Sequence, residues 1–306
     1  MEQNLESFEE QLFQLTNKDK IKKNEPMEKH TTFRVGGPAD YFLVPERTSE
    51  IADIVQLCRG KNVPYYVIGN GSNLLVGDKG YRGVVIQIYK SMSRIRIEGD
   101  EIIAQAGASL AQTACAAMEA SLTGLEFASG IPGALGGAVV MNAGAYGGEM
   151  KDVLISADVL TRDGRVKTLT VEELELGYRK SVIPEEGFIV LEVQMRLKRG
   201  KREEIQGRME ELRQKRLEKQ PLEYPSAGST FKRPEGYFAG KLIQDAGLKG
   251  FRVGGAQVSE KHSGFIVNTG GATAAEIQEL IRRVTAAVKE KTGVTLEPEV
   301  RRIGEF

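Results

Sequence analysis

Two glycine-rich stretches are the part of this sequence best suited to binding chemistry. In residues 130–148, seven of nineteen residues are glycine, and residues 68–76 read Ile-Gly-Asn-Gly-Ser-Asn-Leu-Leu-Val between two apolar runs. Glycine allows the backbone to approach a ligand closely, and the N–H groups of such loops bind phosphate oxygens. Either stretch alone fits a tight turn. Together they predict a large phosphorylated cofactor that is held along its length by backbone N–H groups.

The common nucleotide motifs do not account for these glycines. No segment matches the P-loop pattern G-x-x-x-x-G-K-[ST]. Gly69 and Gly71 match the first two positions of the dinucleotide pattern G-x-G-x-x-G, but Leu74 stands at the third. The helix and the acidic ribose ligand that should follow are also missing. The sequence therefore argues against a P-loop kinase and a typical NAD domain, and it indicates a different flavin- or nucleotide-binding fold.

Composition narrows the class of protein further. The 306 residues suffice for two or three domains, and 42 Lys plus Arg balance 42 Asp plus Glu, so the overall positive charge typical of nucleic-acid-binding proteins is missing. The histidines, His30 and His262, are too few for a His-rich metal site. Cys58 and Cys115 are predicted to be small buried side chains rather than disulfide partners or metal ligands. The lack of a signal-peptide pattern and of any membrane-length apolar stretch predicts a cytoplasmic protein.

Hydrophobic periodicity indicates the elements that must carry the two loops. In the first 120 residues, helices are expected at 5–19, from Thr48 or Ser49 onward, and at 109–120. Strands are expected at 41–44, 64–68 and 84–88, with a hairpin of 94–97 and 102–106 around Gly99-Asp100. The second helix has one apolar face, formed by Ile51, Ile54, Val55 and Cys58.

The second half of the chain changes character near residue 200, where a domain boundary is predicted. Before it, strands are expected at 153–161, 166–169 and 189–197. After it, the pattern predicts a charged helix at 201–219 with an Ile205, Met209 and Leu212 stripe, helices at 237–246 and 273–291, and a strand at 295–303. The last helix has a capping box, Thr273 with Glu276, and a glycine stop at Gly293.

Five segments, taken in order, make the sequence recognisable. Residues 69–76 and 130–137 resemble the FAD-binding domain of the vanillyl-alcohol-oxidase type. With Gly-Tyr-Arg-Lys-Ser at 177–181, Ser-Ala-Gly-Ser-Thr-Phe-Lys at 226–232 and Leu-Glu-Pro-Glu-Val-Arg at 296–301, the chain resembles the UDP-N-acetylenolpyruvoylglucosamine reductase family of bacterial flavoenzymes. The resemblance covers roughly residues 24 to 304.

This resemblance implies an α+β fold. A PCMH-type FAD-binding domain of two subdomains, about 24–88 and 89–199, would be followed by a smaller α+β substrate domain at 200–306. Residues 1–23 would form an N-terminal helix and connector. The chain looks like the compact branch of the family, because Tyr224 is the only tyrosine between residues 179 and 229 and no long tyrosine-bearing insert is present.

The resemblance also implies a reaction. NADPH would reduce non-covalently bound FAD, and the enolpyruvyl ether of UDP-N-acetylglucosamine would then enter the same site. Hydride would pass from flavin N5 to C3 of the enolpyruvyl group, and a proton added at C2 would give UDP-N-acetylmuramate for peptidoglycan, and hence for cell-wall biogenesis, cell shape and cell division. No metal, nucleic acid, membrane or protein partner is implied.

Three residues match the family's catalytic positions. Ser229 would donate the proton to C2, and Arg179 would hold the substrate carboxylate in a fork. Glu299 would hydrogen-bond the same carboxylate, which would need the pKa of Glu299 to be raised by burial. By their residue types alone, Ser229 fits a turn, Arg179 a surface charge and Glu299 a solvent-facing strand position.

The remaining site residues are assigned by the resemblance and by position. The expected cofactor-binding residues are Gly69, Asn70, Gly71, Ser72, Asn73, Leu74, Ser129, Gly130, Pro132, Gly133, Gly136, Gly137, Asn142, Ala143, Gly144, Ala145 and Ile189. The expected substrate-binding residues are Lys232, Arg233, Lys241, Gln244, His262 and Asn268. Two alternatives stay open: another oxidoreductase of the same FAD fold, which covalent flavin on a His or Cys would favour, and a non-catalytic nucleotide-binding module.

Overall fold

The computed structural model describes residues 7–16 and 20–306, which fold into two compact units. The first unit takes in the described residues up to Lys23, then 41–70 and 83–213. The second takes in residues 24–40, 71–82 and 214–306. The predicted boundary near residue 200 precedes helix α6 (Arg202–Lys219), whereas the division between units falls within that helix, after Arg213.

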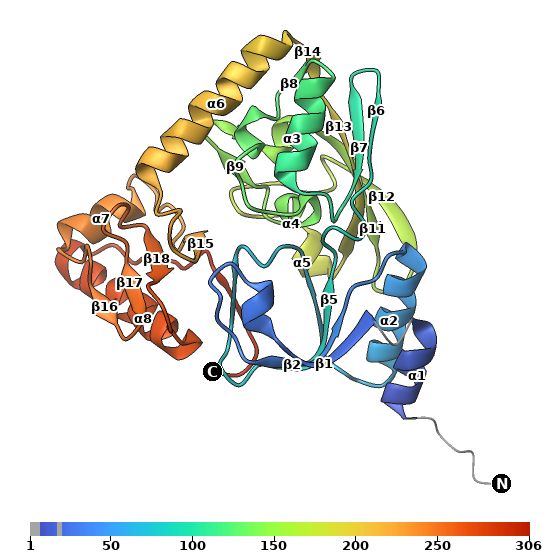
Figure 1. Cartoon of the computed structure of the whole chain (residues 1–306), viewed down its shortest axis with the longest axis horizontal. Helices are drawn as coiled ribbons and strands as arrows, with labels where there is room; N and C mark the ends of the chain where they lie inside the picture. The colour runs from blue at the N-terminus through green and yellow to red at the C-terminus, as the bar shows by residue number, and fades with distance from the viewer. Residues whose placement is uncertain (1–6, 17–19) are drawn as a thin grey trace. The chain divides into compact units, whose positions relative to one another are not determined.

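Each predicted helix is present, and Figure 1 labels the helices. They are α1 (Phe8–Leu15), α2 (Thr48–Gly60), α3 (Leu110–Glu119), α4 (Leu135–Val140), α5 (Ile183–Glu186), α6 (Arg202–Lys219), α7 (Ala239–Asp245) and α8 (Ala274–Thr292), with short 3-10 turns η2 (Met27–His30), η3 (Glu126–Ala128) and η4 (Met150–Asp152). Helices α4 and α5 were not predicted. The first predicted helix is shorter than expected, because Thr16, after the last residue of α1, is extended. Residues 5, 6 and 17–19 of the first predicted helix lie outside the described residues. The capping box at Thr273 and Glu276 and the stop at Gly293 are confirmed for α8.

The strands are mostly short. They are β1 (Ile21–Pro26), β2 (Pro38–Leu43), β3 (Tyr65–Ile68), β4 (Leu74–Val76), β5 (Tyr81–Gln87), β6 (Ile95–Glu98), β7 (Glu101–Gln105), β8 (Leu122–Thr123), β9 (Gly144–Ala145), β10 (Gly148–Glu149), β11 (Leu154–Leu160), β12 (Val166–Thr170), β13 (Ile189–Arg196), β14 (Lys198–Arg199), β15 (Ser226–Ser229), β16 (Arg252–Val253), β17 (Ala256–Val258), β18 (Phe265–Asn268) and β19 (Arg301–Ile303).

An antiparallel sheet in the order β12-β11-β13-β7-β6 organises the first unit. The predicted hairpin is present in it as β6–β7, and the strands expected at 153–161 and 166–169 pair as a second hairpin, β11–β12. Helix α4 packs on β13 and β7, and the side chains between them join a large apolar core. A second sheet has the order β1-β2-β5-β3, in which β3 and β5 run parallel.

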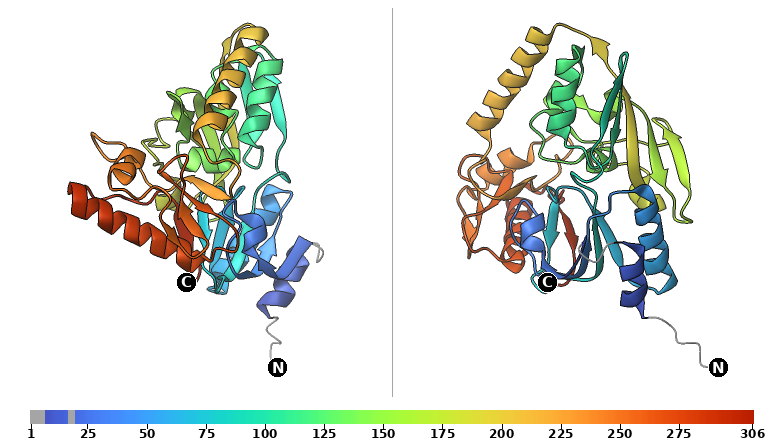
Figure 2. Two further views of the ribbon diagram at one scale, coloured as in Figure 1. Left: turned by 60° about the vertical axis from the view of Figure 1, so that its left-hand side comes forward. Right: turned by 45° about the vertical axis from the view of Figure 1, so that its right-hand side comes forward.

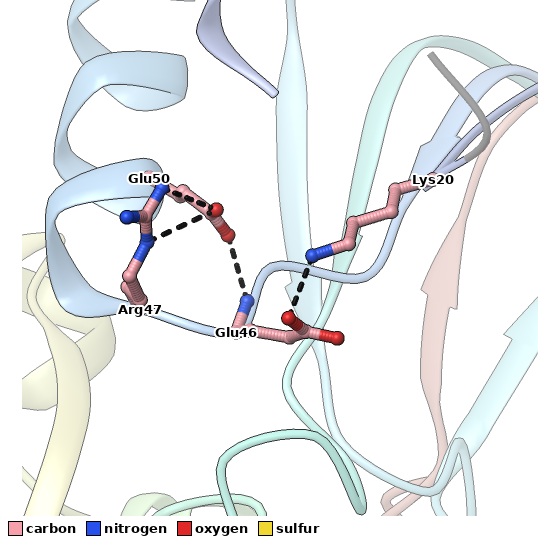
Figure 3. A network of polar contacts seen from close by, with 4 residues as sticks. All are labelled: Lys20, Glu46, Arg47 and Glu50. Atoms are coloured by element: carbon pink, nitrogen blue, oxygen red, sulfur yellow. Dashed lines mark hydrogen bonds and ion pairs between the residues drawn. The ribbon is translucent and has the colours of Figure 1, made fainter. Parts of the chain in front are cut away.

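The start of α2 differs from its prediction. Neither Thr48 nor Ser49 caps the helix, because the N-cap is Arg47 and it makes no side-chain cap bond. Buried Glu50 instead holds the chain that enters the helix: one carboxylate oxygen accepts from the Glu46 N–H at 2.8 Å and the other from the Arg47 guanidinium at 2.9 Å (Figure 3). Burial alone would raise the pKa of Glu50, but these bonds outweigh it and the pKa lies below its ordinary value.

The second unit has its own core under a sheet in the order β15-β18-β17-β16. Helix α8 packs along β16 and β17 (red in Figure 2). Asp78, from the segment after β4, holds the start of α8, because its two carboxylate oxygens accept from the N–H groups of Ala274 and Ala275 at 2.7 and 2.9 Å. In the same unit, β4 pairs in parallel with β19.

Two sequence predictions need correction here, and a third is confirmed. The strand expected at 295–303 is regular only over β19, because Pro298 lacks the N–H that a ladder needs and makes only an isolated bridge with Phe231. Cys58 is buried as predicted, and its burial raises the pKa of the thiol to about 12. Cys115 is exposed, since it lies on the outer face of α3.

Among the described residues, no helix is both long enough and apolar enough to cross a membrane.

Candidate functional site

The two glycine-rich loops meet in the first unit. Gly69 lies so close to Ala134 that a Cβ at residue 69 would be 2.8 Å from the Ala134 Cβ. The neighbouring Asn70 donates its side-chain amide to the Pro132 carbonyl at 3.0 Å. Glycine at residue 69 is therefore required by loop packing, and the sequence-distant loops form one surface.

The α4 end of this surface contains two glycines with different surroundings. Gly136 donates its N–H to the Ala106 carbonyl at 2.8 Å, and a Cβ there would lie 2.9 Å from the Ala106 Cβ. Gly137 is exposed, and a Cβ there would meet no atom within 4 Å. Packing explains the first glycine, whereas the second leaves open space beside the loop.

The rest of this loop is held by local bonds. The Ser129 hydroxyl donates to the Glu126 carbonyl at 2.8 Å, and the Gly133 carbonyl accepts from Leu110 at 3.0 Å. Gly130 and Pro132 are exposed. Ile189 is buried in the core of the unit, so packing already explains its side chain.

The segment after α4 folds back as the short pair β9–β10, which contains Gly144 and Ala145. Asn142, just before it, is fully buried and its amide is occupied within the protein. Its Nδ2 donates to Glu149 at 2.9 Å and to the Gly177 carbonyl at 3.1 Å, and its Oδ1 accepts from the Lys151 N–H at 2.9 Å. A direct cofactor contact by this amide therefore has no support from the geometry. Ala143 contributes backbone bonds to Ala138 and Met150.

Arg179 lies in a tight turn of the first unit. Gly177 and Lys180 exchange two backbone hydrogen bonds of 3.1 and 3.2 Å around it. Arg179 has φ of +55°, a conformation that costs a non-glycine residue on the order of 1–2 kcal/mol. Its guanidinium lies 5.2 Å from the Tyr178 ring centroid and 3.5 Å from the Gly144 carbonyl. The turn thus presents a half-buried guanidinium on a strained but defined backbone.

The second unit brings together the other two predicted catalytic segments and the end of the first glycine loop. The Glu299 N–H donates to the Thr230 carbonyl at 2.8 Å, which places Glu299 beside the residue that follows Ser229. The Asn73 amide donates to the Glu299 carbonyl at 3.1 Å, and the Asn73 carbonyl accepts from the Arg301 N–H at 3.0 Å. Continuous hydrogen bonding therefore links loop residue Asn73, Glu299 and the Ser229 strand.

Several of these positions depend on the backbone rather than on side chains. Gly71 has φ of +63°, and a Cβ there would lie 2.0 Å from the His30 carbonyl oxygen, so no other residue fits. Ser72 is half-buried, and Leu74 is buried in β4. The accessible part of this loop is therefore half-buried Ser72, one residue before Asn73, which bonds Glu299.

Ser229 ends a bulged strand. Ser226 pairs with Val267 and Ser229 with Phe265, so β15 carries an extra residue relative to β18. Gly228, with φ of +75°, lies in that bulge. Bulges commonly re-aim a side chain next to an active site. Ser229 is exposed, which suits a group that must reach a substrate.

The predicted substrate cations follow Ser229 in the same unit. Lys232 forms an ion pair with Glu297 at 2.5 Å, and its N–H donates to the Glu297 carbonyl at 2.8 Å. The Arg233 guanidinium lies 4.0 Å from the centroid of the Phe238 ring. On α7, Lys241 forms an ion pair with Asp245, and Gln244 is exposed.

The other two predicted substrate residues have structural bonds. Buried Asn268 donates to the Phe33 carbonyl at 3.1 Å and accepts from the N–H groups of Gly270 and Ala272. These bonds explain its amide, so a substrate contact stays a prediction. His262 packs edge-on against Phe265, and its Nδ1 accepts from the Gly264 N–H at 3.1 Å.

His262 should make stability depend on pH. Burial lowers its pKa below the ordinary value of 6.5. The unfolded chain then binds a proton more readily than the folded one, so the contribution to stability is complete above pH 6.5 and is lost as the pH falls from 6.5 through the lower pKa of the folded protein. We expect His262→Asn, which keeps an acceptor for Gly264, to flatten this decline. Urea unfolding at acidic and neutral pH measures it, and an equal decline in both proteins would contradict the assignment.

Comparison with known proteins identifies the family. Residues 39–170 match the model of the FAD binding domain, and residues 220–303 match the C-terminal domain of UDP-N-acetylenolpyruvoylglucosamine reductase. The reductase of Agathobacter rectalis is 58% identical over 99% of this chain and 98% of its own length. The chain belongs to the UDP-N-acetylenolpyruvoylglucosamine reductase family.

Two further relatives support this result. The UDP-N-acetylenolpyruvoylglucosamine reductase of Caldanaerobacter subterraneus subsp. tengcongensis is 52% identical over 97% of this chain and 98% of its own length. The crystal structure of the Thermus caldophilus reductase is 41% identical, has a TM-score of 0.80, and covers 92% of this chain and 98% of that one. The predicted fold class, an FAD-binding domain with a C-terminal domain, is confirmed.

The joined loops of this UDP-N-acetylenolpyruvoylglucosamine reductase family member leave Gly137 exposed, with no protein atom within 4 Å of the position of a Cβ. The close contact between Gly69 and Ala134 holds the two loops together beside it. Backbone groups of the same loops suit pyrophosphate oxygens.

The two glycines of α4 should separate cofactor binding from stability. We expect Gly137→Ala to leave stability unchanged or raise it by up to about 1 kcal/mol, since alanine favours a helix, while FAD affinity falls about tenfold. Gly136→Ala should instead destabilise the protein by about 1–3 kcal/mol, because its Cβ meets Ala106. Thermal unfolding of apoprotein and FAD titration by flavin fluorescence distinguish these effects. Wild-type FAD affinity in Gly137→Ala would show that this surface does not line the cofactor.

Sequence reasoning missed the residues that join the site. Thr230 is fully buried; its hydroxyl accepts from the Ile266 N–H at 3.0 Å, and its carbonyl accepts from Glu299. Asp78 ties the segment after the first loop to α8. A threonine inside a motif and an aspartate in a loop carry no periodic signal, so only the long-range pairing could have found them.

Proposed function

We propose that this chain catalyses the NADPH-dependent reduction of UDP-N-acetylenolpyruvoylglucosamine to UDP-N-acetylmuramate. Family membership supports the activity, and one structural observation supports the site: the bonds from Asn73 to Glu299 and from Glu299 to Thr230 gather a cofactor loop and two candidate catalytic residues. The product is a peptidoglycan precursor. A reaction between NADPH and a nucleotide sugar belongs in the cytoplasm.

The glycine loops hold FAD through their backbone groups, at residues 69–73 and 129–137. FAD supplies hydride transfer at its N5 atom. The protein's own task is to orient the enolpyruvyl group, to stabilise the negative charge that develops after hydride reaches C3, and to deliver a proton to C2. NADPH and the sugar nucleotide use the site in turn.

The catalytic residues divide this task by their chemistry. Arg179 binds the substrate carboxylate bidentately, which stabilises the enolate-like charge. Glu299, in its protonated form, donates a hydrogen bond to the same carboxylate. The Ser229 hydroxyl donates its proton to C2, because an enolate-like carbanion is a base strong enough to take it. Lys232, Arg233 and Lys241 are the candidate partners of the diphosphate.

Anaerobic spectroscopy tests this proposal directly. FAD absorbance in the purified protein should bleach with NADPH and return on addition of UDP-N-acetylenolpyruvoylglucosamine. Bleaching without return would indicate another oxidoreductase of the same fold, and flavin that stays with the denatured protein would favour it further. Failure to bind FAD after reconstitution would indicate a nucleotide-binding module without catalysis.

A further inference from the structure

The C-terminal end of α4 and Asn142, two residues beyond it, contact the Arg179 turn at both of its ends. The Asn142 amide donates to the Gly177 carbonyl at 3.1 Å, two residues before Arg179. The Ser181 hydroxyl donates to the Val140 carbonyl at 2.8 Å, two residues after it. Both side chains are buried, at 0% and 2% exposure. The turn is therefore fastened on either side of Arg179 to one helix end.

Asn142 is rigidly placed for this contact. Its second amide hydrogen bonds Glu149 at 2.9 Å, and its carbonyl oxygen accepts from the Lys151 N–H at 2.9 Å. These bonds fix the side-chain rotamer. Its backbone has φ of +39°, a region that asparagine tolerates better than most residues. Asparagine at this position thus meets a backbone need and a hydrogen-bonding need together.

The Arg179 turn requires such support. A residue with positive φ in a two-residue turn persists only when its surroundings hold it there. A bidentate contact with a carboxylate is lost when the guanidinium moves by about 1 Å. A helix end buried in the core is a firmer anchor than the exposed side of the turn, where Tyr178 is 54% exposed.

We propose that Asn142 and Ser181 are positioning residues that clamp the Arg179 turn to α4, and that Asn142 serves the reduction of the enolpyruvyl group through Arg179 rather than as an FAD ligand. The catalytic half of this inference rests on the proposed role of Arg179. The clamp itself rests only on contacts within the first unit.

The variants Asn142→Gly and Ser181→Ala remove one fastening each. Glycine keeps positive φ accessible, and Ser181→Ala removes a single hydroxyl. Thr113→Val in α3 is the matched control, because it removes another buried hydroxyl bond to a backbone carbonyl, that of Ser109 at 3.0 Å. Hydrogen exchange of residues 174–182 should accelerate in both variants and stay unchanged in the control.

Half-reactions of the holoenzyme then test the link to Arg179. The rate of FAD reduction by NADPH should stay within about twofold of wild type in both variants. The rate of FAD reoxidation by the enolpyruvyl substrate should fall about tenfold in Asn142→Gly and about threefold in Ser181→Ala. In an Arg179→Lys background, each change should add less than about twofold, because residues that act through one another are not additive.

Several results would overturn the inference. Unchanged exchange at 174–182 would refute the clamp whatever the activity. Equal losses in both half-reactions with less bound FAD, or full additivity with Arg179→Lys, would make Asn142 a cofactor or purely structural residue. If Asn142→Gly does not fold, hydrogen exchange and the half-reactions of Ser181→Ala still test whether the clamp exists. If the FAD of the wild-type protein bleaches with NADPH but does not recover with the enolpyruvyl substrate, the proposed function is refuted. Hydrogen exchange at 174–182 would still test the clamp in that case.

Discussion

Replacing Ser229 by alanine should leave flavin reduction by NADPH intact and slow the recovery with UDP-N-acetylenolpyruvoylglucosamine by about 10²–10⁴-fold, the range for loss of a positioned proton donor. The residue is exposed at the end of a bulged strand, so removal of its hydroxyl leaves no buried group unpaired. Anaerobic stopped-flow absorbance measures both half-reactions. The effect should therefore appear in one half-reaction and not in stability.

Ser226→Ala is the matched control for this variant, since Ser226 lies on the same strand before the bulge. It should recover within about twofold of wild type. If Ser229→Ala recovered normally, another group would donate the proton to C2. If it slowed NADPH reduction equally, Ser229 would be serving the flavin site as a whole.

Replacing Arg179 by lysine should slow recovery about 10–100-fold, because hydrogen bonds to charged groups contribute about 1.5–3 kcal/mol each and lysine cannot form a fork. The charge is retained, so the loss reports geometry rather than net electrostatics. NADPH reduction should change by less than about threefold. Single-turnover recovery at several substrate concentrations separates the rate of chemistry from binding.

The neighbouring Lys180→Ala variant controls for a general change of charge at the turn. Lys180 is exposed and lies 3.5 Å from Glu185 in a surface ion pair, which contributes little. Its recovery rate should match wild type. A loss as large as that of Arg179→Lys would mean that the charge of the turn, rather than the fork of Arg179, governs the reaction.

The elements that could be predicted from the sequence, such as α2, α6, α8 and the five strands of the first unit's largest sheet, each have a strong local signal. The apolar face of α2 and the capping box of α8 are examples. Helices α4 and α5 and the whole sheet β15-β18-β17-β16 were not predicted, because these elements are too short to show periodicity. The start of α2 could not be predicted, because its N-cap Arg47 makes no side-chain cap bond and Glu50 holds the chain before the helix at Glu46. Residues 295–300 alternate like a strand, yet Pro298 and the bonds of Glu299 to Thr230 leave no regular ladder.

The residue types of the candidate site could be predicted from the sequence, but their arrangement in space could not. Glycines at 69 and 137 look alike in sequence. Contact with Ala134 explains the first, whereas no protein atom lies near enough to Gly137 to require a glycine there. Likewise, Asn142 and Asn73 were grouped as cofactor ligands, whereas the structure shows them bonded to Gly177 and Glu299. Such long-range bonds depend on topology, which no local pattern contains.

The pairing of β4 with β19 has a consequence for folding of the nascent chain on the ribosome. The hydrogen-bond partner of Asn73 is Glu299, 226 positions later in the chain. The Gly77 N–H donates to the Ile303 carbonyl at 3.0 Å, which is also synthesised much later. The flavin loop is therefore unfinished until nearly the whole chain has been synthesised. Nascent chains should therefore not bind FAD before release. A chain truncated before residue 301 should fail to bind FAD, while the core of the first unit still folds.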